Sequence, residues 1–111
     1  MLMLPNAVKV YVAKEPINMK RSFAGLVTLI DAEFKHDPLS GNIFVFFNKP
    51  ANKVKLIYWD RTGFAIWYKF LNQGKFRLPN VGDKLYKISI SDMNLLLEGI
   101  DLTSKQRLKA L

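Results

Sequence analysis

The sequence contains no cysteine among its 111 residues, and this absence excludes two kinds of structural site. Zinc sites built on thiolates and disulfide frameworks both require cysteine, so neither organises this chain. A chain without cysteine fits a reducing compartment, and we expect a cytoplasmic protein.

Long apolar runs are missing as well. No stretch approaches the roughly 20 apolar residues of a membrane-spanning helix, so we expect no membrane partner. The N-terminal sequence MLMLPNAVKV has neither a basic start nor a long apolar core, and we do not expect it to be a signal peptide. Repeats and Gly/Ser linkers are absent too, so we predict that residues 1–111 form a single domain.

Residue patterns that carry catalysis are scarce. His36 is the only histidine, and beside Asp37-Pro38 we expect it to be a solvated loop residue and not a catalytic base. The six glycines are never clustered, so no phosphate-binding loop is present. Asp31 and Glu33 lie two apart on a predicted helix and do not face each other. We predict that the protein is not an enzyme and has no metal or cofactor, and a metal-dependent nuclease stays open only if distant acids converge.

The charge is strongly of one sign. Lysine and arginine number 17 against nine aspartates and glutamates, which gives a net charge of +8. Such a balance points to an anionic partner, either nucleic acid or an acidic protein face. A basic surface with no polyanionic partner is the alternative.

The first half of the chain predicts a strand followed by a helix. Residues 7–13 alternate apolar and polar side chains with the period of a strand. The helix then begins at Asn18 or Ser22, either of which is a plausible N-cap, and ends before Asp37-Pro38. Its apolar stripe has helical spacing and consists of Phe23, Leu26, Val27, Ile30 and Phe34.

Three strand-like runs follow the turn at 37–42, namely 43–47, 54–59 and 64–70. The last two flank Asp60-Arg61-Thr62-Gly63, where Asp first and Gly fourth predict a type I turn and therefore a hairpin.

The C-terminal part predicts shorter elements. Residues 75–78 and 85–90 could be short strands, Ser91 would cap a helix over 92–98 with Gly99 as its stop, and the basic tail 103–111 could be helical or frayed. The order of elements does not alternate, which argues against a doubly wound parallel sheet. We therefore predict an α+β fold: an antiparallel sheet with one amphipathic helix packed on one face and a short C-terminal helix.

Basic and aromatic residues are interleaved in the predicted hairpin. Cations neutralise phosphates and aromatic rings stack on bases, which is a pattern of nucleic-acid binding. Aromatics in a hairpin are more often cross-strand pairs of the core, so we expect most of them to be buried, with the lysines on the solvated face. Basic residues at the start of the first helix oppose its dipole unless an anion binds there. The candidate nucleic-acid-binding residues are Lys20, Arg21, Lys53, Lys55, Arg61, Lys69, Lys75 and Arg77.

Five ordered motifs resemble one family. They are NMKRSFAGL at 18–26, DPLSGNIFVFFN at 37–48, KLIYWDRTGFAIWYK at 55–69, GKF at 74–76 and LLEGID at 96–101. In this order they resemble the TnpB accessory protein, the second open reading frame product, of the insertion sequence sixty-six family of bacterial transposable elements. The chain departs from the family pattern at Asn18, where Asp is usual, at Lys20-Arg21, where the order is inverted, and at Phe70, where Arg is common.

The resemblance implies a part in transposition beside a separate, larger transposase that carries the catalytic acids. Two hypotheses follow for this chain. It is an accessory protein that binds DNA at the element ends through its basic residues, or it is a protein–protein adaptor that docks on the transposase, with an exposed Trp59 or Trp67 as anchor and a homodimer as a further option.

Overall fold

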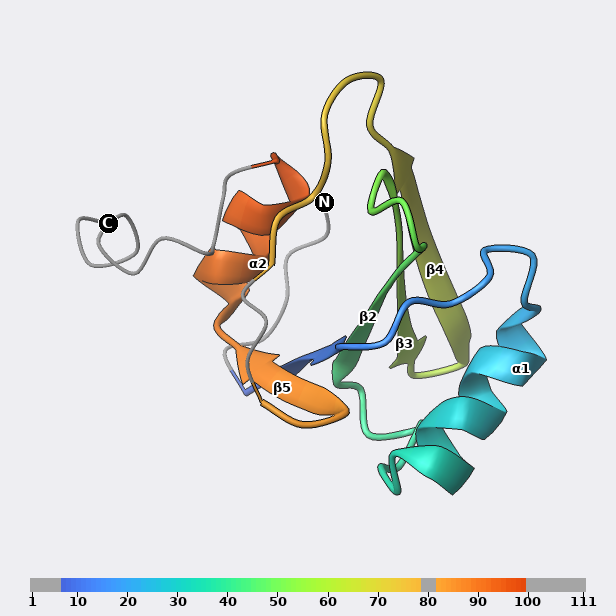
Figure 1. Ribbon diagram of the computed structural model, residues 1–111. Coiled ribbons are helices and arrows are strands. Elements are labelled where there is room, and N and C mark those ends of the chain that lie inside the picture. Colours follow the sequence, from blue (N-terminus) through green and yellow to red (C-terminus); the bar gives the residue numbers. More distant parts are fainter. Residues whose placement is uncertain (1–6, 79–81, 100–111) are drawn as a thin grey trace.

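A five-stranded sheet with helices on both faces forms the body of the protein (Figure 1). The computed structural model describes residues 7–78 and 82–99. Along the chain the elements are β1 (Val10–Ala13), α1 (Phe23–Thr28), the π-helical segment η1 (Leu29–Glu33), β2 (Ile43–Phe47), β3 (Lys53–Asp60), β4 (Gly63–Phe70), β5 (Leu85–Ile88) and α2 (Ile90–Leu97). The predicted α+β class is confirmed, and the predicted tail 103–111 lies outside the described residues.

The strands lie in the order β4-β3-β2-β1-β5, so β4 and β5 are the edges of the sheet. Neighbouring strands are antiparallel except for β1 and β2, which pair in parallel through Val10 and Ile43. A parallel pair requires a crossover between its strands, and α1 with η1 forms this connection. The prediction of a purely antiparallel sheet is therefore corrected to a mostly antiparallel one.

Both faces of the sheet are covered, which corrects the expectation of one packed face. All five residues of β2 are buried, and alternate side chains point to opposite faces. Val45 and Phe47 pack with the apolar side of α2, whereas Phe44 and Phe46 pack with Leu26 of α1. A strand that is buried on both faces reads as a continuous apolar run, as IFVFF does.

Ser22 is the N-cap of α1, because its hydroxyl oxygen accepts from the Gly25 N–H at 3.1 Å. Asn18 makes a separate turn, in which its side-chain oxygen accepts from the Lys20 N–H, so the alternative start at Asn18 is wrong. The helical path ends at Glu33, before Asp37-Pro38 as predicted. Lys35 lies just after this end, and its φ of +55° is outside the range of a right-handed helix.

The hairpin of β3 and β4 is confirmed and extends over Lys53–Asp60 and Gly63–Phe70. The prediction that its turn is of type I is wrong. Arg61 has a φ of +53°, whereas a type I turn needs a negative φ at that position. Two-residue hairpin loops favour a positive φ after the first strand because the right-handed twist of the strands demands it.

The C-terminal helix α2 begins earlier than predicted, at Ile90. The N-cap of α2 is Ser89 and not Ser91, since the Ser89 hydroxyl accepts from the Asp92 N–H at 3.0 Å. This cap shortens the predicted strand 85–90 to Leu85–Ile88. Gly99 follows α2 with a φ of +85°, which confirms the predicted stop.

Residues 75–78 are not a strand, which corrects that prediction. The Phe76 N–H donates to the Ala51 carbonyl, and the buried Phe76 ring packs on Phe47 with the ring centroids 5.4 Å apart. One anchored aromatic residue therefore holds this segment in place of a ladder of hydrogen bonds. None of the helices in residues 7–78 and 82–99 is long and apolar enough to span a membrane.

Candidate nucleic-acid interface

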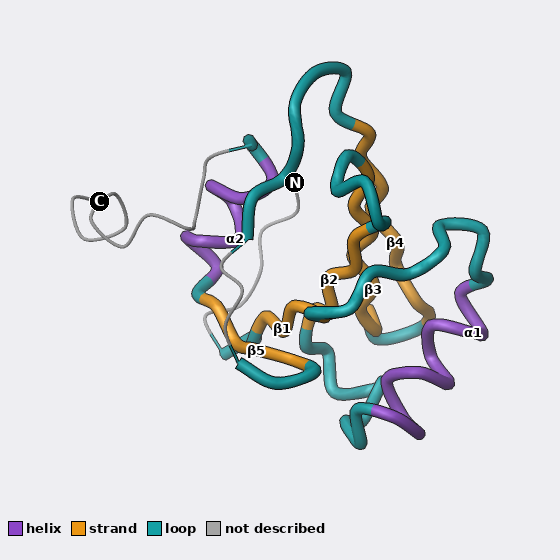
Figure 2. Tube along the Cα trace, viewed as in Figure 1, coloured by secondary structure: helices purple, strands orange, loops and turns teal. Residues whose placement is uncertain are grey.

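Three loops meet at one end of the sheet, where β1, β2 and β4 end and β3 begins (Figure 2). The loop after β1 joins the end of β2 through the Ile17 N–H and the Phe47 carbonyl, 2.8 Å apart. The segment after β4 joins the β2–β3 loop through the Leu71 N–H and the Asn52 carbonyl, also at 2.8 Å. These bonds bring together cations that are far apart in the sequence. We name this set the basic end of the sheet: Lys20, Lys49, Lys53 and Lys55.

Carboxylates are scarce in the segments that build the basic end, where the loop after β1 carries Glu15. Residues 16–30, 38–59 and 61–82 contain no aspartate or glutamate. In the described part of the chain one ion pair forms, between Arg61 and Asp60 at 3.9 Å, and it lies at the opposite end of the hairpin. The cations of the basic end are thus not neutralised by ion pairs among the described residues, which leaves their charge for a partner.

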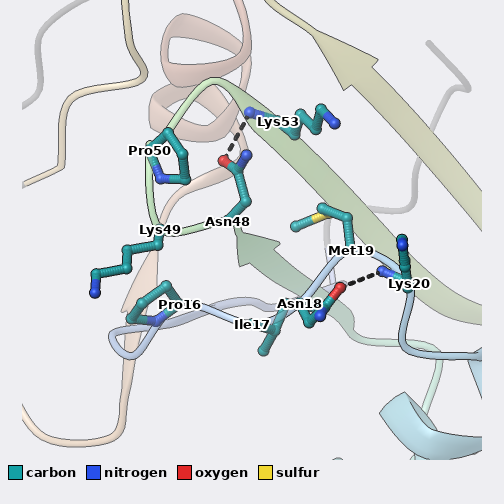
Figure 3. A pocket seen from close by; sticks show the side chains of 9 residues that line it. All are labelled: Pro16, Ile17, Asn18, Met19, Lys20, Asn48, Lys49, Pro50 and Lys53. Atoms are coloured by element: carbon teal, nitrogen blue, oxygen red, sulfur yellow. Dashed lines mark hydrogen bonds between the residues drawn. The ribbon is translucent and has the colours of Figure 1, made fainter.

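A pocket of about 490 Å³ lies between two of these loops (Figure 3). Figure 3 shows lysines from two stretches of the chain around it, namely Lys20 from the loop after β1 and Lys49 and Lys53 from residues 48–53. Asn48 shapes the β2–β3 loop, because its side-chain oxygen accepts from the backbone N–H groups of Asn52 and Lys53 at 3.0 and 2.9 Å. Short side-chain bonds to the backbone therefore fix the loops that carry these lysines.

Lys53 and Lys55 extend over aromatic rings of the neighbouring strand. The Lys53 Nζ lies 5.6 Å from the centroid of Phe70, and the Lys55 Nζ lies 5.2 Å from that of Tyr68. The Lys55 Nζ also donates to the Met19 carbonyl at 2.6 Å. Both lysines are half-buried along their stems, and both keep a positive charge at the surface of the α1 face of the sheet.

The aromatic residues of the hairpin are divided between core and surface. Tyr58 is buried, whereas Trp59, Phe64 and Trp67 are half-buried, so the expectation that most of these rings are buried is wrong. Tyr68 and Phe70 are 49% and 60% exposed, and they share a face with Lys53 and Lys55. The expected separation of buried rings from solvated lysines is therefore wrong for the outer part of β4.

Five of the candidate residues lie outside the basic end. Lys75 and Arg77 flank the buried Phe76, in the segment that runs from β4 toward α2 (Figure 1). Lys69 points to the other face, where its Nζ donates to the Leu97 carbonyl of α2 at 2.8 Å. Arg61 is at the far hairpin turn, paired with Asp60. Arg21 lines a different pocket, together with Glu15 and Glu33.

Three of the candidate residues do come together, namely Lys20, Lys53 and Lys55. Lys49 belongs with them and was not predicted. Its signal in the sequence is its position in NKPANK, the same acid-free loop that leads into Lys53.

The titratable groups are spread out. His36 is half-buried, not solvated as predicted, because its ring packs 4.5 Å from Tyr11 and 5.8 Å from Phe44 between centroids. Within residues 7–78 and 82–99, no three His, Cys, Asp or Glu side chains gather as metal ligands. Burial raises the pKa of Tyr86 from 10.0 to about 12, and burial followed by the charge of Asp60 raises that of Tyr58.

Comparison with known proteins agrees with the resemblance of the five motifs. The family model described as IS66 Orf2 like protein matches residues 8–107. Two proteins of Sinorhizobium fredii (strain NBRC 101917 / NGR234), both described as uncharacterized, are similar over 89% of this chain. The protein y4jC is 36% identical over 85% of its own length, and y4hO is 33% identical over 88% of its length. No solved structure matches the chain.

Proposed function

The chain belongs to the IS66 Orf2-like family, and from this premise we propose that it is a non-catalytic accessory protein of insertion-sequence transposition that binds DNA through the basic end of the sheet. The observation that supports the proposal is a group of lysines from the loop after β1, the β2–β3 loop and β3 around one pocket, in a region with few carboxylates. The candidate partner is the DNA of the element ends.

Phosphate neutralisation is the mechanism that this arrangement supports. Each lysine or arginine that meets a phosphate releases condensed counterions, and the observed affinity then falls with salt. If three or four cations of the basic end make such contacts, the slope of log K against log salt would be about −3 to −4. The loops position the duplex, and contacts to phosphates alone do not recognise its base sequence.

A salt titration with charge-matched variants tests the proposal. Affinity for a duplex from an element end would be measured by fluorescence anisotropy for the wild type and for the triple variant Lys20→Ala, Lys49→Ala, Lys53→Ala. The control removes the same charge elsewhere: Lys9→Ala, Arg61→Ala, Lys87→Ala, at exposed positions next to β1, at the far hairpin turn and in β5. We expect the salt slope to become shallower by about 3 in the first variant and by clearly less in the control.

Equal losses in the two triple variants would show that only net charge matters and would overturn the assignment to the basic end. No binding by the wild type at low salt would overturn DNA binding itself.

The competing hypothesis is the adaptor, for which Trp59 and Trp67 are half-buried and Tyr68 and Phe70 are the exposed rings. It makes a different prediction in a pull-down with the transposase of the element. A complex that survives nuclease treatment, from a protein that does not bind DNA alone, would replace our proposal with the adaptor. A complex that is lost with the nuclease supports DNA binding.

A further inference from the structure

We infer that the α1 face of the β3–β4 hairpin binds single-stranded DNA, with bases stacked on Tyr68 and Phe70 and phosphates held by Lys53 and Lys55. This inference rests on the proposed function and deepens it, because it names the form of nucleic acid that the site takes. Its basis is a row of exposed rings beside a row of lysines, on a strand at the edge of the sheet.

The two rows are set by the register of the hairpin. Lys53 pairs with Phe70, Lys55 with Tyr68, and Ile57 with Ile66. Because alternate residues of a strand share a face, Ile66, Tyr68 and Phe70 form one stripe along β4, and they are 46%, 49% and 60% exposed. Exposed apolar residues in a continuous row mark a binding surface more often than isolated ones do.

The position of β4 leaves this stripe accessible. β4 is an edge strand, and no described strand lies beyond it. The lysines lie one strand inward on β3, with Nζ atoms 5.6 and 5.2 Å from the centroids of Phe70 and Tyr68. A nucleic-acid strand that follows β4 would stack its bases on the rings once the two lysine side chains move from the rings to its phosphates, and Lys55 would exchange its bond to the Met19 carbonyl for one to a phosphate.

The charge of the hairpin favours a polyanion over an apolar partner. Asp60, at the far turn, is the only carboxylate between residues 38 and 82. A partner protein with an apolar face would bury the two lysines beside the rings at a cost in desolvation. A nucleic-acid strand offers both a π-face for each ring and an anion for each lysine.

The spacing of the rings favours an unstacked strand. Residues two apart on a β-strand are about 7 Å apart, which is twice the rise of about 3.4 Å per base in stacked DNA. Successive bases must separate before each can meet its own ring. In a duplex the base faces are already stacked on each other, so the rings would have nothing to contact.

The hairpin face continues into the basic end of the sheet. Lys53 belongs to both, because it lies over Phe70 and also lines the pocket with Lys20 and Lys49 (Figure 3). A strand that leaves the rings at Phe70 would therefore meet further phosphate sites at the pocket. This continuity suits DNA that is paired at one side and open at the other.

Truncation of the rings tests the inference. The variants are Tyr68→Ala, Phe70→Ala and the two combined, with Leu39→Ala as the matched control, since Leu39 is 54% exposed in a turn. Affinity would be measured for a short oligothymidylate and for a duplex of the same length. Each ring should account for a loss of roughly 5- to 150-fold on oligothymidylate, as stacked bases do elsewhere. Duplex affinity should be unchanged, and Leu39→Ala should change neither.

A second pair of variants separates stacking from general hydrophobicity. Phe70→Leu keeps an apolar side chain and should bind oligothymidylate as weakly as Phe70→Ala. Phe70→Trp keeps a ring and should bind as the wild type does. Because Phe70 is exposed, we expect both variants to fold as the wild type does, and circular dichroism would confirm it.

The possible failures are distinct. If duplex DNA binds while the ring variants leave oligothymidylate affinity unchanged, the inference is wrong and the proposed function stands. If neither nucleic acid binds at low salt, both are wrong. If the wild type is a dimer in sedimentation and the ring variants are monomers with unchanged affinity, the stripe is a self-association surface and the inference is overturned.

Discussion

Tyr86 is the residue whose burial is least compensated. Its side chain packs against the core on the α2 face, and its hydroxyl oxygen is buried with no hydrogen-bond partner among the described residues. A buried polar atom without a partner costs about 1–3 kcal/mol of stability. Removing the atom while keeping the ring should recover part of this cost.

We therefore predict that Tyr86→Phe raises the free energy of unfolding by about 1 kcal/mol at pH 7. Urea denaturation of the wild type and the variant would measure the difference. A loss of stability in the variant would contradict the account, because it would mean that the hydroxyl has a partner.

The same residue should make stability sensitive to alkali. Its pKa rises on folding from 10.0 to about 12 because burial disfavours the phenolate. The unfolded chain therefore loses its proton first, and stability should fall from about pH 10 to pH 12, by up to roughly 2 kcal/mol from this group. The drop measured between these pH values should be smaller in Tyr86→Phe, and an identical drop in both proteins would contradict the assignment.

At the scale of elements, most strands and helices were predictable because their side-chain period matches their environment. The strand IFVFF is buried on both faces, and the stripe from Leu26 to Ile30 covers one face of the sheet. The edges of elements were less predictable. Ser89 and Ser91 both fit a cap in the sequence, and only the geometry of the chain leaving β5 selects Ser89.

This selection leads to a paired prediction for α2. Ser89→Ala removes the oxygen that accepts from the Asp92 N–H and should lower the free energy of unfolding by about 1 kcal/mol. Ser91→Ala, within the first turn of the helix, should have little effect or a slightly favourable one. Thermal unfolding of the two variants decides between the caps. A larger loss of stability in Ser91→Ala than in Ser89→Ala would show that Ser91 is the N-cap.

The hairpin turn and residues 75–78 show where local signals fail. Asp60 and Gly63 fit a type I turn by residue type, but the twist of the two strands places Arg61 at positive φ. Residues 75–78 have apolar alternation, yet one contact of Phe76 with the β2–β3 loop decides their path. Both outcomes depend on partners that a local window of sequence does not contain.

At the scale of the whole molecule, the composition predicted an anionic partner but not its place. Lys53 and Lys69 are both hairpin lysines, yet Lys53 faces the pocket and Lys69 caps the end of α2 on the opposite face. Lys49 joins the basic end only because the Asn48 side chain folds the loop back. The gathering of lysines from separate segments is a tertiary property, and net charge alone cannot reveal it.

The central claim is that nucleic acid binds at the basic end of the sheet and along the adjoining face of β4. Nuclear magnetic resonance of the ¹⁵N-labelled protein, titrated with oligothymidylate and then with duplex DNA, tests this place most directly. Our account predicts that amide shifts concentrate in residues 17–20 and 48–53, and that oligothymidylate adds shifts over 66–70. Shifts that concentrate in β5 and α2, with these segments unchanged, would contradict it.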